Sequence, residues 1–195
     1  MKKLDFKYLI LSALILSAHL VSTADVPYKV DGTASKMVIL GTSSVHDWEI
    51  EVADFSCDAA VTNDASGIVN VSDVSVVCEV KNVKSDNKIM DGKTYKALEG
   101  DKHPKITFKS AENISVSANT ATKIKGQLSI AGKTKEVELP FTLHDASDST
   151  VKIAGKMPVK MSDFGIDPPT AMMGALKTGD EVVISYDLTL KKSEK

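Results

Sequence analysis

In this 195-residue chain, His46-Asp47 next to Trp48 is the fragment that most resembles a catalytic arrangement. A histidine held by a carboxylate serves as the general base of many hydrolases. However, residues 46–52 alternate apolar and polar as a β-strand does, and neighbouring side chains in a strand point to opposite faces. The two side chains are therefore expected to diverge rather than to form a catalytic pair.

Other acidic and basic residues offer no better catalytic arrangement. His103 precedes a proline and His144 ends a predicted strand, and neither has a partner at a suitable spacing. Asp163, Asp167 and Asp180 could form an acidic cluster, but turn formation and solvation are their more ordinary roles. Motifs for a serine nucleophile, a zinc protease or a phosphate loop are absent. The sequence predicts no catalytic residue and no enzyme, and a secreted hydrolase is the weakest of the functional alternatives.

The elements that must position these residues are β-strands. From Met37 onward, nearly every stretch alternates apolar with polar residues, most regularly over 124–130, 137–143, 151–161 and 182–190. Period two with one polar face is typical of antiparallel strands whose other face is buried. Because no helix of comparable strength could cover that face, the sheet is expected to cover itself as a barrel or a sandwich.

Composition limits both the kind of barrel and its partners. Aromatic residues make up only 5% of the chain and the polar face is rich in lysine, whereas membrane barrels are apolar outside with aromatic girdles. All 24 basic residues are lysines, and the net charge is −2. Arginine supplies the bidentate grip on phosphates and guanine edges, so its absence argues against nucleic acid. These features predict a barrel with a solvated outer face, and an eight-stranded barrel can hold one small ligand.

Two stretches interrupt the alternation, residues 86–103 and 163–179. In the first, Ser85-Asp86-Asn87 is a helix-start signal and Gly100 is a plausible stop. Interruptions of this length often form functional loops and short helices. We expect both stretches to lie at the entrance of the barrel.

Parity and turn signals predict where strands break. In His46–Val52 the apolar residues are at even positions, whereas in Phe55–Val61 the apolar residues are at odd positions. A parity change within one strand requires an extra residue, which predicts a β-bulge near Ala53-Asp54. Asp31-Gly32 and Ala131-Gly132-Lys133-Thr134 are predicted turns.

The first two dozen residues do not follow the strand pattern. A basic start (Lys2, Lys3 and Lys7) precedes an apolar run over 9–21 and the small residues Ser22-Thr23-Ala24. This order is typical of a secretory signal peptide, and the run is shorter than the roughly 20 apolar residues of a membrane span. We expect residues 1–24 to be removed and residues 25–195 to form one periplasmic or secreted domain. Removal takes away three lysines and Asp5, which changes the net charge from −2 to −4.

The two cysteines, Cys57 and Cys78, fall on apolar positions of predicted strands. An even number of cysteines in an oxidising compartment favours a disulfide, which is the preferred prediction. The alternative is a pair of buried thiols that act as small hydrophobic side chains. A metal site is not expected, because no second pair of ligands has a suitable spacing.

Four segments resemble, in order along the chain, motifs of the YceI-like family of secreted bacterial lipid-binding proteins. GTSSVHDWE at 41–49 resembles the family's opening strand, and KHPKITF at 102–108 resembles its P-x-I-x-F strand entry. GQLSIAGKTK at 126–135 is similar to its G-x-L-T-I-x-G-x-T-K hairpin, and MSDFGID at 161–167 to its D-F/Y-G-I stretch. Each motif is short, but together they run in family order across almost the whole predicted domain.

This resemblance implies an all-β fold, an eight-stranded antiparallel lipocalin-like β-barrel with one or two short helices at the mouth. It also implies a lumen that takes a long polyisoprenoid or an isoprenoid quinone-like tail, with no other cofactor. The chain departs from the family pattern at Cys57 and Cys78 and in the insert at 168–173, which we expect at the barrel mouth.

The residues predicted to face the lumen are the candidate ligand contacts. They are mainly aliphatic, with methionines that suit a flexible hydrocarbon, and they could equally fill a solid core. They are Trp48, Ile50, Phe108, Leu128, Ile130, Leu139, Phe141, Ile153, Met157, Met161, Phe164, Ile184 and Tyr186. A solid core would favour an envelope or stress-related interaction protein instead of a lipid carrier.

Overall fold

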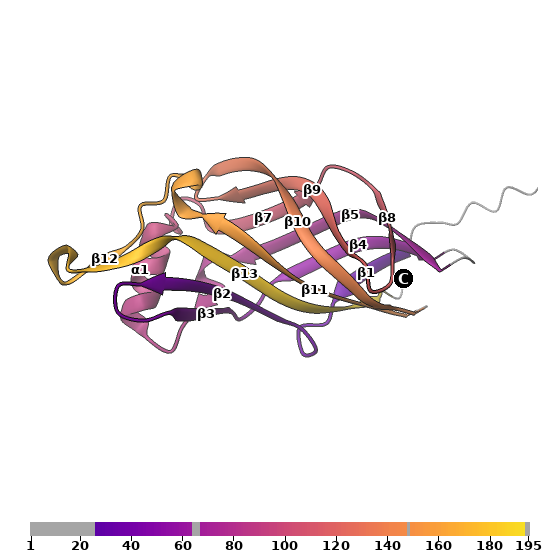
Figure 1. Ribbon diagram of the computed structural model, residues 1–195, viewed down its shortest axis with the longest axis horizontal. Coiled ribbons are helices and arrows are strands. Elements are labelled where there is room, and N and C mark those ends of the chain that lie inside the picture. The colour runs from indigo at the N-terminus through magenta and orange to yellow at the C-terminus, as the bar shows by residue number, and fades with distance from the viewer. Residues whose placement is uncertain (1–25, 64–66, 148, 194–195) are drawn as a thin grey trace, which may run out of the picture.

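Antiparallel strands make up most of the computed structural model, which describes residues 26–63, 67–147 and 149–193 (Figure 1). The predicted signal peptide lies outside these residues. The strands are β1 (Val26–Val30), β2 (Lys36–Ser43), β3 (Trp48–Val52), β4 (Ser56–Asn63), β5 (Ile68–Glu79), β6 (Val83–Lys84), β7 (Lys105–Ser110), β8 (Ile114–Ser117), β9 (Ala121–Ile130), β10 (Lys133–Ala146), β11 (Thr150–Lys160), β12 (Thr170–Ala171) and β13 (Leu176–Lys192). The helical elements are α1 (Lys88–Ala97) and the short 3-10 segments η1 (Val80–Asn82), η2 (Met161–Phe164) and η3 (Met172–Gly174).

The sheet closes on itself. Neighbouring strands pair in the order β1-β4-β5-β7-β9-β10-β11-β13, and β13 pairs back with β1, which gives a closed antiparallel barrel of eight strands. The 17-residue strand β13 pairs with β11 along one edge. Along its other edge it pairs with β1 near its end and with β2 nearer its start. The predicted barrel is confirmed.

Strands on one side of the barrel are each interrupted midway. β1 continues as β2 after a turn, β3 as β4 after a break at residues 53–55, and β5 as β6 after η1. The buried side chains change parity across the second interruption, from Val52 to Cys57. The interruption lies at the predicted place, but the predicted β-bulge near Ala53-Asp54 is wrong, because the strand breaks there instead of adding one bulged residue. The backbone N–H of Ala53 donates to the carbonyl of Asn82 at 2.8 Å, so neighbouring interruptions are bonded to each other.

The turn between β1 and β2 is tied to the strand that closes the barrel. The backbone N–H of Asp31 donates to the carbonyl of Thr189 at 2.8 Å, and the Asp31 carboxylate pairs with Lys191 at 2.6 Å. The same carboxylate accepts hydrogen bonds from the backbone and hydroxyl of Thr33. The bond from Lys191, followed by those from Thr33, holds the pKa of Asp31 well below its usual range. The predicted turn at Asp31-Gly32 thus sits at the closure between β1 and β13.

The hairpin between β9 and β10 turns within the predicted residues 131–134, but its turn has only two residues, because Lys133 and Thr134 already belong to β10. Ala131 and Gly132 both adopt positive φ, 48° and 74°, and Ile130 pairs with Lys133 across the turn. Two left-handed residues give the backbone twist that matches two twisted strands, which explains the glycine at the second position.

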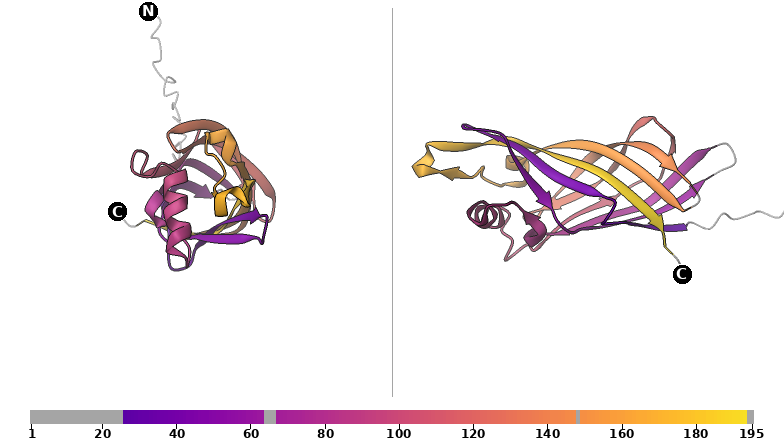
Figure 2. Two further views of the ribbon diagram at one scale, coloured as in Figure 1. Left: turned by 90° about the vertical axis from the view of Figure 1, so that its left-hand side faces the viewer. Right: turned by 90° about the horizontal axis from the view of Figure 1, so that it is seen from below.

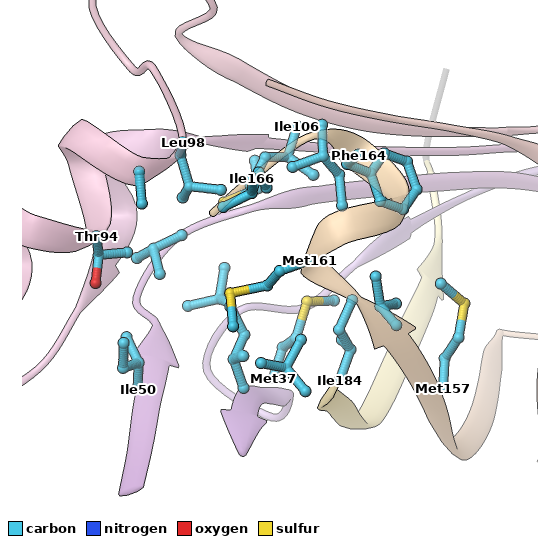
Figure 3. Close-up of a pocket in the computed structure, with 18 of the residues that line it drawn as sticks. Met37, Ile50, Thr94, Leu98, Ile106, Met157, Met161, Phe164, Ile166 and Ile184 are labelled. Atoms are coloured by element: carbon cyan, nitrogen blue, oxygen red, sulfur yellow. The ribbon is translucent and has the colours of Figure 1, made fainter. Parts of the chain in front are cut away.

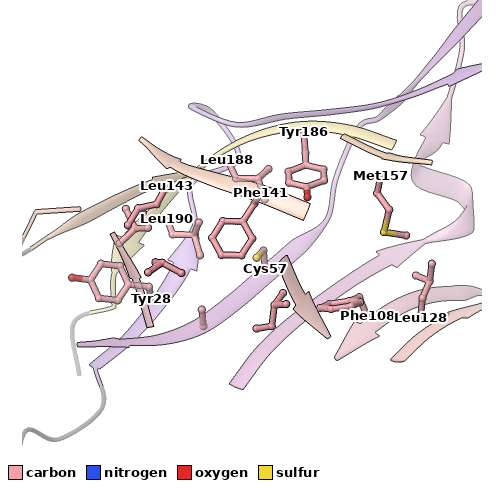
Figure 4. Packing of buried hydrophobic residues seen from close by; sticks show 14 of the residues in the cluster. Tyr28, Cys57, Phe108, Leu128, Phe141, Leu143, Met157, Tyr186, Leu188 and Leu190 are labelled. Carbon is pink, nitrogen blue, oxygen red and sulfur yellow. The ribbon is translucent and has the colours of Figure 1, made fainter. Parts of the chain in front are cut away.

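The two ends of the barrel differ. At one end lie α1, the turn between β2 and β3, and the hairpin of β12 and β13, whereas β1 begins and β13 ends at the other (Figures 1 and 2). The second end is filled by buried side chains (Figure 4). They include Tyr28, Val61, Val69, Val116, Ile124, Phe141, Leu143, Val151 and Leu190. This end is the closed end, and the opposite end is the mouth.

Helix α1 occupies the first predicted interruption and lies at the mouth. Its N-cap is Asn87, whose side chain accepts hydrogen bonds from the backbone N–H groups of Ile89 and Met90. Such a cap satisfies two of the amides that have no partner within the helix. The expected short helix at the mouth is therefore present, and it begins at the predicted start signal.

The closed end should carry more of the barrel's stability than the open half. Leu143 is 1% exposed in the closed-end core, whereas Ile184 is half-buried in the open half. We expect Leu143→Ala to lower the free energy of unfolding by about 2–5 kcal/mol, because it leaves a cavity in packed surroundings. Ile184→Ala should cost about 1 kcal/mol, because its side chain has fewer packing partners to lose. Urea unfolding of both variants measures the difference, and equal costs would mean that the two halves are equally packed.

Candidate ligand-binding cavity

The open half of the barrel holds a cavity of about 380 Å³. This lies within the roughly 300–1,000 Å³ of small-molecule sites. All the predicted lumen residues except Phe141 line it: Trp48, Ile50, Phe108, Leu128, Ile130, Leu139, Ile153, Met157, Met161, Phe164, Ile184 and Tyr186. Side chains from α1, the strands and η2 converge on the same space in Figure 3. The positions are thus as the alternation predicted, while contact with a ligand stays a prediction.

Phe141 is the exception, and its assignment to the lumen was wrong. It belongs to the buried cluster of the closed end, together with Leu143 and Tyr28 (Figure 4). Strand β10 runs from its mouth-side hairpin toward that end, and Leu139, two residues earlier, does line the cavity. Alternation shows that Phe141 points inward but does not show how deep the open space extends. The cavity floor therefore lies between Leu139 and Phe141 on this strand.

Partial burial of inward-facing residues shows that the lumen is hollow here. Half-buried apolar residues line the cavity on several strands, although they point inward and not toward the outer surface: Met37, Ile39, Val74, Val76, Ile106, Leu139, Ile153, Val182 and Ile184. In the closed end, by contrast, Ile124 and Leu143 are only 2% and 1% exposed. The barrel is thus solid at one end and open at the other, which disfavours a wholly solid core.

The mouth adds lining residues that strand alternation did not reveal. Met90 and Thr94 of α1 and its C-cap residue Leu98 face the cavity at the four-residue spacing of one helix face. After η2, Ile166 and Pro169 line it as well. The four-residue spacing of these side chains is present in the sequence, but nothing in the sequence shows which face of the helix meets the barrel.

The second predicted interruption is partly core. Phe164 and Ile166 are 3% and 5% exposed, and Gly165 between them takes a left-handed conformation that ends η2. The stretch 163–179 therefore contributes a buried wall of the cavity before it reaches the hairpin of β12 and β13. Pro169 and Thr170 line the cavity, so the insert at 168–173 begins at the mouth as expected.

Trp48, the only tryptophan of the chain, lines the cavity and packs on a glycine. A Cβ atom on Gly41 would lie 2.1 Å from the Trp48 ring, so only glycine lets the ring lie against β2. The indole N–H donates to the carbonyl of Thr42 at 3.0 Å. The ring is thereby held at the wall of the cavity that it lines, and its fluorescence should report occupancy.

Polar groups of the lining are few and lie near the mouth. The charged lining residues are Lys93 and Lys177, on α1 and β13, and the ammonium of Lys93 donates to the carbonyl of Thr170 at 3.4 Å. Deeper in, the hydroxyl of Tyr186 donates to the carbonyl of Pro140. Burial raises the pKa of Tyr186, with the nearby Cys57 adding to the shift, so this hydroxyl stays neutral. The interior therefore suits an apolar ligand whose polar end stays at the mouth.

The predicted disulfide is not formed, and both cysteines are free, buried thiols. Cys57 on β4 pairs with Val76 on β5, and Cys78 pairs with Ile106 on β7. The two cysteines are therefore offset diagonally by two residues, and diagonal Cα atoms lie roughly 7–8 Å apart, beyond usual disulfide geometry. Sequence parity placed both thiols on the inner face but could not give this register. Desolvation by burial raises the pKa of Cys57 to about 12 and that of Cys78 to about 11.

The residues considered for catalysis do not come together in the structure. The His46 ring bonds the backbone carbonyl of Asp47 at 2.7 Å, not its carboxylate. Asp163 pairs with Lys135 at 3.2 Å, and Asp180 accepts hydrogen bonds from the backbone and hydroxyl of Ser162. In the part of the chain that the structure describes, no group of three or more His, Cys, Asp or Glu could hold a metal ion. No helix within that part is long and apolar enough to cross a membrane.

Comparisons with known proteins agree with this geometry. A model of the YceI-like domain matches residues 28–190. BcnA of Burkholderia cenocepacia has a similar solved structure, with 22% identity and a TM-score of 0.66 over 82% of this chain and 98% of BcnA. A polyisoprenoid-binding domain from Saccharophagus degradans matches at 12% identity and a TM-score of 0.64, over 86% of this chain and 99% of that domain. The YceI protein of Campylobacter jejuni matches at 19% identity and 0.58, over 72% and 82%. No curated protein matches this chain.

The burial of both thiols can be tested with a thiol reagent. In native protein at pH 8, we expect Cys57 and Cys78 to react very slowly, because they are buried and protonated. In guanidinium chloride without reductant, both thiols should react, and Cys57→Ala should leave one. If the denatured, non-reduced protein shows no reactive thiols, the two cysteines are joined by a disulfide after all.

The thiols also set a direction for the pH dependence of stability. Folding raises both pKa values above their ordinary 9.0. The stability contributed by the protonated thiols is therefore complete below about pH 9 and is lost as the pH rises through the folded-state values. Unfolding free energies measured from pH 8 to pH 10.5 should fall less in a Cys57→Ala Cys78→Ala variant than in the parent protein.

Proposed function

Because this chain belongs to the YceI-like family, whose model spans residues 28–190, we propose that it holds one long apolar molecule, such as a polyisoprenoid, in its barrel. The observation that carries the proposal is the cavity, which is closed at one end, open at the other and lined mainly by aliphatic side chains. The similar domain from Saccharophagus degradans is named for polyisoprenoid binding, which supports the same ligand class here. The protein acts by binding, without a chemical step.

The shape of the cavity sets the orientation of the ligand. The floor is packed side chains, and the buried hydroxyl of Tyr186 is already bonded. Ser43, His46, Thr94 and the two lining lysines are all on elements of the mouth. A chain with one polar end therefore enters tail first, and its polar end stays near α1.

Binding should strengthen steeply with the length of the apolar tail. Ligands of this size reach at most roughly 0.3 kcal/mol per heavy atom. A forty-carbon isoprenoid could then gain about 12 kcal/mol, near nanomolar affinity, whereas a ten-carbon analogue would gain only about 3 kcal/mol. We expect titrations that follow Trp48 fluorescence to show this trend, with little effect of salt. Equal affinities for short and long tails would contradict burial of the tail in the cavity.

A charge in the lumen should abolish binding. Leu128 lines the cavity, while Gln127, its neighbour on β9, is exposed on the outer face. Leu128→Glu should prevent binding of an isoprenoid, because an unpaired carboxylate is costly in apolar surroundings, and Gln127→Glu should leave the affinity unchanged. Circular dichroism checks that Leu128→Glu folds. Ile153→Phe, which fills the cavity without a charge, should weaken binding of long tails in native mass spectra, and unchanged affinity in both lumen variants would refute the site.

We also propose that the protein works in the periplasm or outside the cell after residues 1–24 are removed. The order of basic, apolar and small residues at its start supports this location. Material isolated from the periplasm of its native host should have an N-terminus at Asp25. A membrane-bound species that still carries Lys2 and Lys3 would contradict processing at this position.

A further inference from the structure

Exposed large apolar side chains in the described part of the chain occur at the mouth. They are Val45, Ile89 and Met173, which are 62%, 74% and 107% exposed relative to a fully accessible side chain. Val45 lies in the turn between β2 and β3, Ile89 in the first turn of α1, and Met173 in η3, between β12 and β13. All three elements project at the same end of the barrel (Figures 1 and 2). We call these three side chains the rim residues.

Hydrogen bonds between nearby side chains and the local backbone hold two of the rim residues in place. The Ser43 hydroxyl accepts a hydrogen bond from the backbone N–H of Val45 at 3.2 Å and donates one to the carbonyl of His46 at 2.8 Å. The Asn87 side chain accepts from the backbone N–H of Ile89 at 2.9 Å. Met90, the next residue, lines the cavity. The exposure of Val45 and Ile89 therefore follows from well-bonded turns.

Met173 is exposed in an unfavourable conformation. Its φ of 55° is in the left-handed region, and Gly174 follows with a φ of 88°. Glycine, asparagine and aspartate are the usual residues at such positions, because a larger side chain is disfavoured there. Neither turn preference nor burial within the chain explains a methionine at this tip. Contact with an apolar phase outside the protein would bury this exposed side chain.

The arrangement fits a bilayer better than a protein partner. A stable protein interface buries roughly 800 Å² on each partner, whereas the rim residues are separate tips around an opening. A bilayer needs no complementary face, because aliphatic side chains can enter its interfacial region one by one. A long apolar ligand is also stored in a membrane rather than in water.

We propose that the mouth docks on a lipid bilayer by inserting Val45, Ile89 and Met173. The cavity then opens toward the bilayer, and an apolar ligand passes between the two without crossing water. The ligand's passage rests on the function proposed above, whereas docking itself does not. Charged residues near the rim have both signs, including Lys88, Lys93, Asp47 and Asp86. Docking is therefore governed by apolar insertion and depends weakly on salt.

Flotation with phosphatidylcholine vesicles tests the docking. The protein should float with the vesicles, and the variant V45S/I89S/M173S should have a partition coefficient lower by at least about tenfold. The matched control is A111S/A118S/A121S, which changes three exposed alanines away from the mouth and should bind as the parent protein does. The rim positions are exposed, so both variants should keep the thermal stability of the parent.

Ligand uptake separates docking from the binding function. With all-trans-retinol as a fluorescent isoprenoid, the rim variant should bind normally when retinol is added in dilute ethanol, but should take it up from phosphatidylcholine vesicles at least about tenfold more slowly. Failure of the parent protein to float, or flotation and uptake unchanged in the rim variant, would overturn the proposal. The proposal would also be overturned if the parent protein did not bind vesicles but self-associated, and the rim substitutions abolished that self-association. The mouth would then dock on a second copy of this chain. If retinol does not bind from solution while flotation is lost as expected, docking stands and the proposed ligand fails.

Discussion

Pairing of β13 with β1 is the interaction on which the rest of the structure depends. It closes a sheet that would otherwise leave two edges unpaired and one apolar face exposed to water. Because β13 also pairs with β2 near the mouth, the two halves of the first strand share one partner. The Asp31 turn between them is bonded to Thr189 and Lys191 at the closure. The bore of the barrel at both ends is therefore set by this one strand.

Closure of the sheet does not determine whether side chains fill the interior. The size of the inward side chains determines this separately at each end of the barrel. Tyr28, Phe141 and Leu143 fill the closed end. Toward the mouth, the strands on one side pass through interruptions and the inward residues become half-buried. A barrel of eight strands is near the limit at which its own side chains can fill it. Stability and ligand capacity are consequently divided between the two ends, with the floor of the cavity at the level of Leu139 and Leu188.

The sequence predicted which side chains of each strand point inward. It did not predict how far along the barrel each residue lies or which residue it pairs with. Alternation places a residue inward or outward, so Leu128, Ile153 and Ile184 were assigned to the lumen correctly as positions. Phe141 has the same parity and lies below the floor, because parity carries no information on height along the barrel. Likewise, two inward cysteines suggested a bridge, and the register of β4 and β5 offsets them by two residues. Height and register arise from long-range pairing, which a single sequence does not encode locally.

The apolar lining of the hollow half is unfavourable when the barrel is empty. Apolar lining that is not covered by protein is hydrated or left without packing partners, and either state is less favourable than contact with a hydrocarbon. A bound tail therefore supplies the packing that Ile153 and Ile184 lack in the free barrel. Ile89 at the rim also lacks packing partners. It follows the helix cap and stays exposed, while the next residue, Met90, turns into the cavity. The rim residues are separate apolar tips around the opening, and a bilayer that covers them would extend to the mouth the apolar surroundings that the tail meets inside.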